Sequence, residues 1–203
     1  MVRIASIHRD FKLILTALAV EHVNILESVL QSTDIRMGVE DWTWIAKKHS
    51  MKQPQRLQRC KISSVQHWKS TGLFGHEYLL LTMLDLIPND NQPPQLYTRF
   101  IKIERGVKRS NYLASFTASL LTSGGEADPL DIITISPTAF STEGSYLLNT
   151  LEFEETLPTV AHLAAVLKAV HVKAPKYTLY SSMCYWFAGA AFEGLGYLCT
   201  GMY

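Results

Sequence analysis

The sequence predicts an α+β domain in which an antiparallel sheet packs on a buried C-terminal helix and follows an N-terminal helical region. Apolar residues recur at helical spacing in the first third, short apolar runs between turn signals occupy the middle, and residues 184–199 carry almost no charge. The 203 residues are enough for a hydrophobic core. We expect residues 1–60 to form a helical extension and residues 61–203 to form the main domain, with both packed as one compact unit.

The composition is that of a globular protein, with 47% hydrophobic and 18% charged residues. A net charge of +1 gives no electrostatic basis for binding nucleic acid or an anionic membrane. The three cysteines are too few for a disulfide framework and lack metal-ligand spacing. We therefore expect a reducing compartment, no metal and no cofactor.

The N-terminal stretch "FKLILTALAV" resembles part of a signal peptide that would be cleaved after Ala19. However, Asp10 interrupts the basic region, and apolar positions continue at helical spacing past the supposed cleavage site. This pattern predicts one amphipathic helix over residues 8–30 and a cytoplasmic protein. No apolar run reaches the ~20 residues of a membrane-spanning helix.

The remaining elements follow from local patterns. The stretch "VEDWTWIAKKHS" predicts a helix with Trp42 and Ile45 facing inward, and "MKQPQRLQRCK" after it reads as an exposed linker. Apolar runs with strand-forming residues predict two strands that form a hairpin with a long loop at 85–95, and two later strands follow. Pro158 is expected in the first turn of the next helix. The predicted strands cover 75–84, 96–106, 129–137 and 146–155, and the two last helices cover 158–174 and 184–199.

The final helix is apolar nearly all round, and Glu193 is its only charged residue. It should therefore be buried on more than one side. Glycine lowers helix stability, so Gly189, Gly194 and Gly196 suggest that a neighbouring backbone approaches closely.

Cys184 stands at the start of this helix and has two interpretations. A cysteine beside an apolar segment is usually a small core residue. At a helix N-terminus, the helix dipole can also stabilise a thiolate and make it a nucleophile. Among the seven histidines, His76 is the best base, because it follows a glycine and enters a strand. If the hairpin is centred near Asp90, His76 lies opposite Glu104, which can orient the imidazole. Alternatively, Glu104 pairs with Arg105 or Lys102 on an exposed strand end.

The order of "GHEYLLL", "FIKIERG" and "YTLYSSMCYWFAGAAFEGL" resembles a group of fungal, especially basidiomycete, proteins. These carry a His-Glu-aromatic strand, an "LRIDR"-like strand and a terminal helix with the pattern Y-x-L-x-x-x-N-C-[YW]-[WF]-F-A. The order also resembles the circularly permuted papain-like fold of NlpC-type amidases and lecithin:retinol acyltransferase. The resemblance covers residues 72–199 and implies Cys184 as nucleophile, His76 as base and Glu104 as third member. Met183 stands where the family usually has Asn, so a cap or oxyanion donor is missing unless Ser181 or Ser182 replaces the cap.

These residues predict a thiol-dependent acyl-transfer enzyme that forms a thioester intermediate on an amide, ester or thioester substrate. Water, an amine or an alcohol would resolve the thioester, which leaves hydrolase, acyltransferase and cyclase open. The aromatic residues Tyr177, Tyr180 and Trp186 suggest an apolar pocket for a small-molecule or peptide acyl substrate, although core packing explains them equally well. The alternative is a non-catalytic interaction module with a degenerate papain-like site.

Overall fold

The computed structural model describes residues 34–52, 54–71, 75–89, 92–107, 128–154, 156–176 and 184–200. Its elements in chain order are β1 (Ile35–Gly38), α2 (Val39–Lys52), α3 (Pro54–Arg59), β2 (Cys60–Ser70), β3 (Glu77–Asn89), β4 (Gln92–Val107), β5 (Pro129–Ser136), β6 (Ser145–Glu152), α5 (Val160–Lys173) and α6 (Cys184–Thr200).

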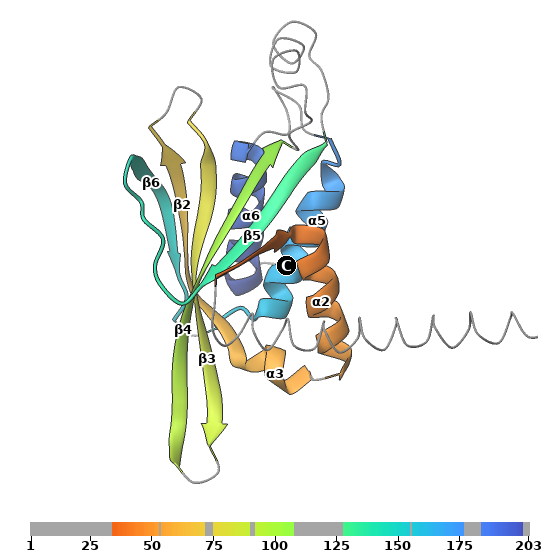
Figure 1. Cartoon of the computed structure of the whole chain (residues 1–203), viewed down its shortest axis with the longest axis vertical. Helices are drawn as coiled ribbons and strands as arrows, with labels where there is room; N and C mark the ends of the chain where they lie inside the picture. Colours follow the sequence, from red (N-terminus) through yellow and green to blue (C-terminus); the bar gives the residue numbers. More distant parts are fainter. Residues whose placement is uncertain are drawn as a thin grey trace, which may run out of the picture.

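The six strands form one antiparallel sheet in the order β1-β5-β4-β3-β2-β6. The labelled helices lie on one side of this sheet, to its right in Figure 1. Consecutive strands β2, β3 and β4 are neighbours, whereas β5 crosses to the other side of β4 and β6 to the other side of β2. The predicted α+β class and antiparallel sheet are confirmed.

The core lies between the sheet and the helices. Alternate residues along each central strand point toward the helices and are buried, as the two-residue period of a strand requires. The sheet contributes Val65, Leu79, Leu81, Met83, Ile101, Ile103, Ile133 and Ile135, and the helices contribute Trp42, Ile45, Leu163, Leu167, Phe187 and Leu195. Burying one such side chain contributes roughly 1.5–3 kcal/mol, so this layer is the main source of stability.

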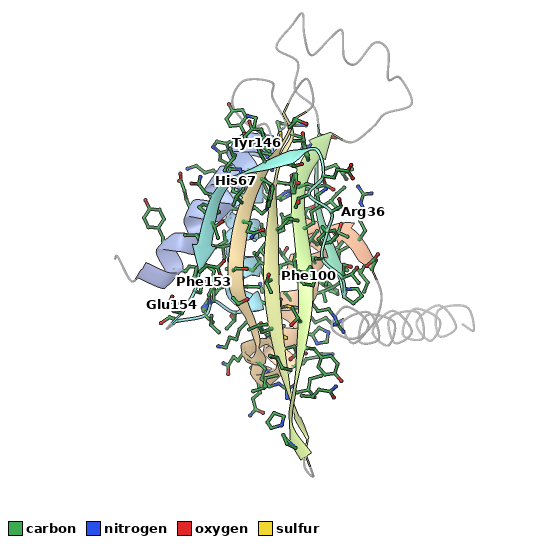
Figure 2. All side chains as sticks on the ribbon, turned by 90° about the vertical axis from the view of Figure 1, so that its left-hand side faces the viewer. Arg36, His67, Phe100, Tyr146, Phe153 and Glu154 are labelled. Carbon is green, nitrogen blue, oxygen red and sulfur yellow. The ribbon has the colours of Figure 1, made fainter. Side chains whose placement is uncertain are left out.

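The opposite face of the sheet is the outer face, which Figure 2 views directly. Its central residues include Leu80, Thr82 and Phe100, and all three are half-buried rather than buried. Among the described elements, no helix covers this face in Figure 1. The two faces therefore differ in depth of burial although both carry apolar residues.

The predicted helix with Trp42 and Ile45 inward is confirmed, since both residues of α2 are buried. The predicted exposed linker at 51–61 is wrong. This stretch holds α3 and the first residues of β2, and Leu57 and Cys60 are buried in the core. One apolar residue on a short, otherwise polar helix is enough to fix it to the sheet, and polar composition alone did not indicate this.

The predicted long loop at 85–95 is also wrong, because β3 continues to Asn89 and β4 begins at Gln92. In this part of the hairpin each strand pairs only with the other, since β2 reaches β3 only as far as Asp85 and β5 reaches β4 only from Phe100. Pro93 and Pro94 are tolerated there because an edge strand does not need every backbone N–H for pairing.

The helix α5 begins at Val160, after an N-cap at Thr159, so Pro158 precedes the cap rather than standing in the first turn. The Thr159 hydroxyl accepts from the backbone N–H of His162, and the Thr159 N–H donates to His162 Nδ1. This reciprocal pair satisfies two helix-terminal donors and explains where the helix starts.

The last helix is less enclosed than predicted. Phe187, Ala191 and Leu195 of α6 are buried, but Tyr185 and Tyr197 are 43% and 64% exposed. The expectation that a neighbouring backbone approaches Gly189, Gly194 and Gly196 is wrong, because the nearest neighbours within 4 Å are side-chain atoms of Val166 and Leu151. A Cβ on Gly194 would meet Val166 Cγ1 at 3.0 Å, whereas a Cβ on Gly189 would have nothing within 4 Å.

The predicted helix over 8–30 lies outside the described residues. The predicted boundary at residue 60 stays a prediction, but β1 and α2 share one core with the later elements, since β1 pairs with β5 and α2 contributes buried residues. Within the described ranges, no helix combines the length and apolarity needed to cross a bilayer.

Candidate active site

The helix α6 begins at Cys184 and packs against β3 and β4. The Cys184 side chain is buried, with 5% of the residue exposed. The first backbone N–H groups of a helix have no partner within the helix, and they carry its positive partial charge. The position at the start of α6 agrees with a stabilised thiolate, and the burial agrees with a small core residue, so the placement of Cys184 fits both interpretations of the sequence.

His76 immediately precedes β3 rather than lying on it. Gly75 before it has φ +49°, a left-handed conformation that suits glycine. The His76 carbonyl accepts a hydrogen bond of 2.8 Å from the backbone N–H of Ser70, the last residue of β2. The turn and this bond together fix the backbone that carries the imidazole.

Glu104 on β4 lies next to His76, with Nε2 of the imidazole 3.3 Å from Oε2 of the carboxylate. The pairing that led to this contact was wrong by two residues, because Tyr78 rather than His76 lies opposite Glu104 in the ladder. A shift of two residues keeps the same face of a strand, so the side chains still meet. The alternative expectation, that Glu104 forms an ion pair with Lys102 or Arg105, also holds in part, since Lys102 Nζ lies 3.0 Å from Glu104 Oε2.

The charges of these groups are coupled. Hydrogen bonds with Cys184 and then with Glu104 raise the pKa of His76 to about 9. The same contact with His76 lowers the pKa of Glu104 to about 2, and Lys102 adds to this effect. Burial raises the pKa of Cys184, but hydrogen bonds with His76 and with the backbone N–H of Glu77 outweigh burial and lower it overall. At neutral pH, His76 is therefore a cation beside an acidified thiol.

The sequence interpretation missed three neighbouring side chains. His67 Nε2 donates to Glu77 Oε2 at 2.9 Å, and Lys69 Nζ donates to Glu77 Oε1 at 2.9 Å. Glu77 and His67 are both buried. The missing information was the strand β2 itself: without it, His67 had no regular context. The available signal in "KISSVQHWKS" was the pair of β-branched apolar residues Ile62 and Val65, both of which are buried in β2.

The predicted substrate-binding residues have different outcomes. Tyr177 and Tyr180 lie outside the described residues. Trp186 is half-buried and packs against the core, and its ring centroid lies 5.9 Å from the guanidinium carbon of the buried Arg105. This placement agrees with the core-packing interpretation of Trp186.

No group of three or more His, Cys, Asp and Glu side chains in the described part of the chain is arranged to hold a metal ion. The candidate site therefore consists of a thiol, an imidazole and a carboxylate from α6, the turn before β3, and β4.

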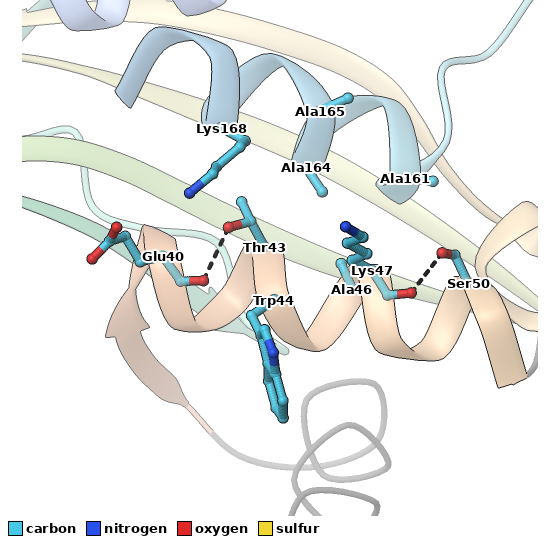
Figure 3. Close-up of a pocket in the computed structure, with 10 residues that line it drawn as sticks. All are labelled: Glu40, Thr43, Trp44, Ala46, Lys47, Ser50, Ala161, Ala164, Ala165 and Lys168. Atoms are coloured by element: carbon cyan, nitrogen blue, oxygen red, sulfur yellow. Dashed lines mark hydrogen bonds between the residues drawn. The ribbon is translucent and has the colours of Figure 1, made fainter. Parts of the chain in front are cut away.

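A separate groove of ≈ 470 Å³ lies between α2 and α5 (Figure 3). Alanines form much of its wall on α5, and Lys47 and Lys168 extend into it. Its hydroxyl groups are already used within α2, because Thr43 donates to the Glu40 carbonyl at 3.0 Å and Ser50 to the Lys47 carbonyl at 2.7 Å. None of the predicted site residues lines this groove.

Comparisons with models of protein families, with curated proteins and with solved structures find no match for this chain. The fold and the cluster of Cys184, His76 and Glu104 define an α+β protein with a thiol–imidazole–carboxylate site.

Proposed function

We propose that the protein is a thiol-dependent acyl-transfer enzyme with a circularly permuted papain-like domain. Cys184 is the nucleophile, His76 the general acid and base, and Glu104 the group that orients the imidazole. The observation that carries the proposal is the position of His76, whose Nε2 lies 3.3 Å from Glu104 Oε2 and whose pKa is raised by hydrogen bonds with Cys184 and with Glu104. An activated nucleophile needs a base that is itself oriented by a third group.

The reaction follows from the charges at neutral pH. The Cys184 thiolate attacks the acyl carbon, and the negative charge moves to the carbonyl oxygen, where backbone N–H groups at the α6 N-terminus stabilise it. When the carbonyl reforms, the bond to the leaving group breaks, and the protonated His76 gives its proton to that group. Neutral His76 then takes a proton from water, an amine or an alcohol, which attacks the thioester and releases Cys184 as thiolate.

The test is site-resolved alkylation with limiting iodoacetamide, followed by mass spectrometry of the cysteine peptides across pH 5–10. Cys184 should be labelled fastest at neutral pH, and its pH midpoint should lie below the ordinary value for a free thiol of about 8.5. His76→Ala should raise this midpoint. Cys60, which is buried in the core, is the internal control and should label slowly. Equal labelling of Cys184 and Cys60 would contradict the proposal.

The second candidate is an interaction module that uses this fold without catalysis. The small exposed fraction of Cys184, 5%, favours it, because a buried thiol is poorly placed to meet a substrate. In that case, a panel of thioester and activated-ester substrates should give the same turnover for the wild type and for Cys184→Ala. A loss of turnover in Cys184→Ala, with no loss in Cys60→Ala, would favour the enzyme.

A further inference from the structure

Three strands bring one row of polar side chains to the end of the sheet that carries the candidate site. Lys69 on β2 lies opposite Glu77 on β3 and opposite Tyr146 on β6. In Figure 2, His67 and Tyr146 are labelled at the same end of the sheet. Glu77 is bonded to the site through its backbone, because its N–H donates to the Cys184 sulfur. One member of the row, Glu77, therefore contacts the sulfur through its backbone.

The row places a buried carboxylate on Glu77, the residue whose backbone N–H donates to the Cys184 sulfur. Glu77 is only 7% exposed, and its carboxylate accepts one hydrogen bond from His67 and one from Lys69. A carboxylate near a thiolate disfavours the thiolate unless a cation offsets it. The Lys69 ammonium, 2.9 Å from Glu77 Oε1, supplies that cation.

Lys69 is also held over the turn that carries His76. A Cβ on Gly75 would lie 2.5 Å from Lys69 Cε, so the lysine side chain passes directly across this glycine. The side chain is 34% exposed, so the ammonium keeps contact with solvent while its stem covers the turn. The Glu77 carboxylate and the Cys184 sulfur both raise the pKa of Lys69, with Glu77 the larger cause, so Lys69 remains a cation at working pH.

We infer that Lys69 is a positioning residue for Cys184: its ammonium offsets the buried Glu77 carboxylate and so keeps the neighbouring sulfur in the thiolate form. This inference rests on the proposed function and adds a residue from β2 to it. Lys69 acts through Glu77 and through its charge, and it takes no part in bond making. Two charged side chains interact with the sulfur itself, His76 before β3 and Lys69 on β2. The titratable and charged partners of these two are Glu104 for His76, and Glu77 and Tyr146 for Lys69; Lys102 and His67 in turn contact Glu104 and Glu77.

The inference predicts opposite effects for the two partners of one ion pair. Lys69→Met removes the cation and should make Cys184 label about three to ten times more slowly at pH 6, because the Glu77 carboxylate is no longer offset. Glu77→Gln leaves the ammonium unopposed and should make labelling faster at the same pH. The double variant should return close to the wild-type rate. If Lys69 and Glu77 only supported the local structure, the alkylation rate of Cys184 would fall in both single variants or change in them without opposite signs.

The experiment measures the pH profile of Cys184 alkylation in the full chain for the wild type, Lys69→Met, Glu77→Gln and the double variant. Lys69→Arg should retain the wild-type profile, since it keeps the charge. Lys61→Met is the matched control on the same strand, about 26 Å away along β2, and should change nothing. Circular dichroism and thermal melts of each variant identify any that fail to fold. If one single variant does not fold, the pH profiles of the other single variant and of Lys69→Arg decide whether the charge of Lys69 controls the thiolate.

The outcomes separate this inference from the proposed function. If wild-type Cys184 has the midpoint of an ordinary thiol, the proposed function fails and this inference fails with it. If the wild-type midpoint is low but Lys69→Met leaves it unchanged, or if Lys69→Met and Glu77→Gln move it in the same direction, only the role of Lys69 is overturned. Opposite shifts that cancel in the double variant would establish it.

Discussion

Arg105 on β4 and Asp131 on β5 form a two-point ion pair, in which Nε and Nη2 each donate to one carboxylate oxygen at 2.6 Å. Both residues are buried. Arg105 also donates to the Ala174 carbonyl just after α5, and its guanidinium carbon lies 4.6 Å from the ring centroid of Phe187 on α6. One buried cation thus joins two strands to the end of α5 and the first turn of α6, the helix that carries Cys184.

Breaking this pair should be strongly destabilising. Asp131→Asn leaves the Arg105 charge buried without its partner, and we expect a loss of about 3–5 kcal/mol in the free energy of unfolding. Urea denaturation measures it. The matched control is Asp128→Asn, three residues earlier, whose partner Lys176 is exposed and lies 2.8 Å away. An exposed pair contributes only about 0–1 kcal/mol, so equal losses in the two variants would contradict the argument.

Glu104 should control the protonation of His76. Glu104→Gln removes a hydrogen bond and a negative charge from the imidazole, so the pKa of His76 should fall from about 9 toward its ordinary value of 6.5. A titration of the histidine ring by nuclear magnetic resonance checks this. Glu193→Gln is the control, because Glu193 is exposed and lies more than two turns along α6 from Cys184. The expectation is wrong if both variants leave the His76 titration unchanged.

Glu104 should also contribute to acid stability. Its pKa is lowered from 4.5 to about 2 in the folded protein, so its contribution is fully present above pH 4.5 and is lost as the pH falls through 2. Urea unfolding between pH 5 and pH 2 should therefore show a shallower decline for Glu104→Gln than for the wild type. Parallel curves would exclude this contribution.

Cys184 and His76 should have opposing effects on stability at higher pH. The raised pKa of His76 gives stability below pH 6.5 that is lost as the pH rises through 9. The lowered pKa of Cys184 gives stability that increases as the pH rises toward the ordinary pKa of a free thiol. Cys184→Ser removes the thiol effect and also weakens the first effect, because the contact with Cys184 is the larger cause of the raised His76 pKa. What remains comes from Glu104, so the stability of this variant should fall above pH 6.5 without the opposing rise that the wild type has. Identical slopes in urea unfolding would rule out the coupled pair.

Two glycines should respond to alanine in opposite ways. Gly75 has φ +49°, and a Cβ there would displace Lys69, so Gly75→Ala should destabilise by about 1–2 kcal/mol. Gly189 lies inside α6, and a Cβ added there would have nothing within 4 Å, so Gly189→Ala should stabilise by about 0.5–1 kcal/mol. Thermal melts compare the two, and a loss of stability in Gly189→Ala would show that a neighbouring group crowds this position.

The elements that could be predicted from the sequence are those with a strong local pattern of apolar residues. Helical spacing around Trp42 predicted α2, and the apolar runs predicted the cores of β3 and β4. The strand β2 was missed because the polar His67 and Lys69 stand among its inward-facing residues, where an apolar pattern was expected. Both side chains bond to Glu77, a residue of another strand, and the pairing of two strands cannot be read from the sequence of either strand alone.

The candidate site was predictable as a set of residues but not as a geometry. The helix-terminal Cys184 and the His76 after a glycine both have local signals. The contact of His76 with Glu104 came from an assumed register that was two residues out, and it survived because side chains on one strand face repeat every two residues. The role of Glu77 had no signal, since its contact with the sulfur comes from the backbone.

The hairpin of β3 and β4 extends past the helices in Figure 1, and its two ends differ in the number of neighbouring strands. Near Tyr78 and Glu104 both strands have further neighbours, whereas beyond Asp85 and before Phe100 they have only each other. Amide hydrogens in the outer part should thus exchange by local fraying, while those beside the site need far larger openings. A fluorophore or short peptide attached at Gln95, which is exposed and lies opposite Ile87, would stand about 33 Å along the hairpin from Glu77. The protein can therefore be labelled or immobilised there without disturbing the end of the sheet that lies beside Cys184.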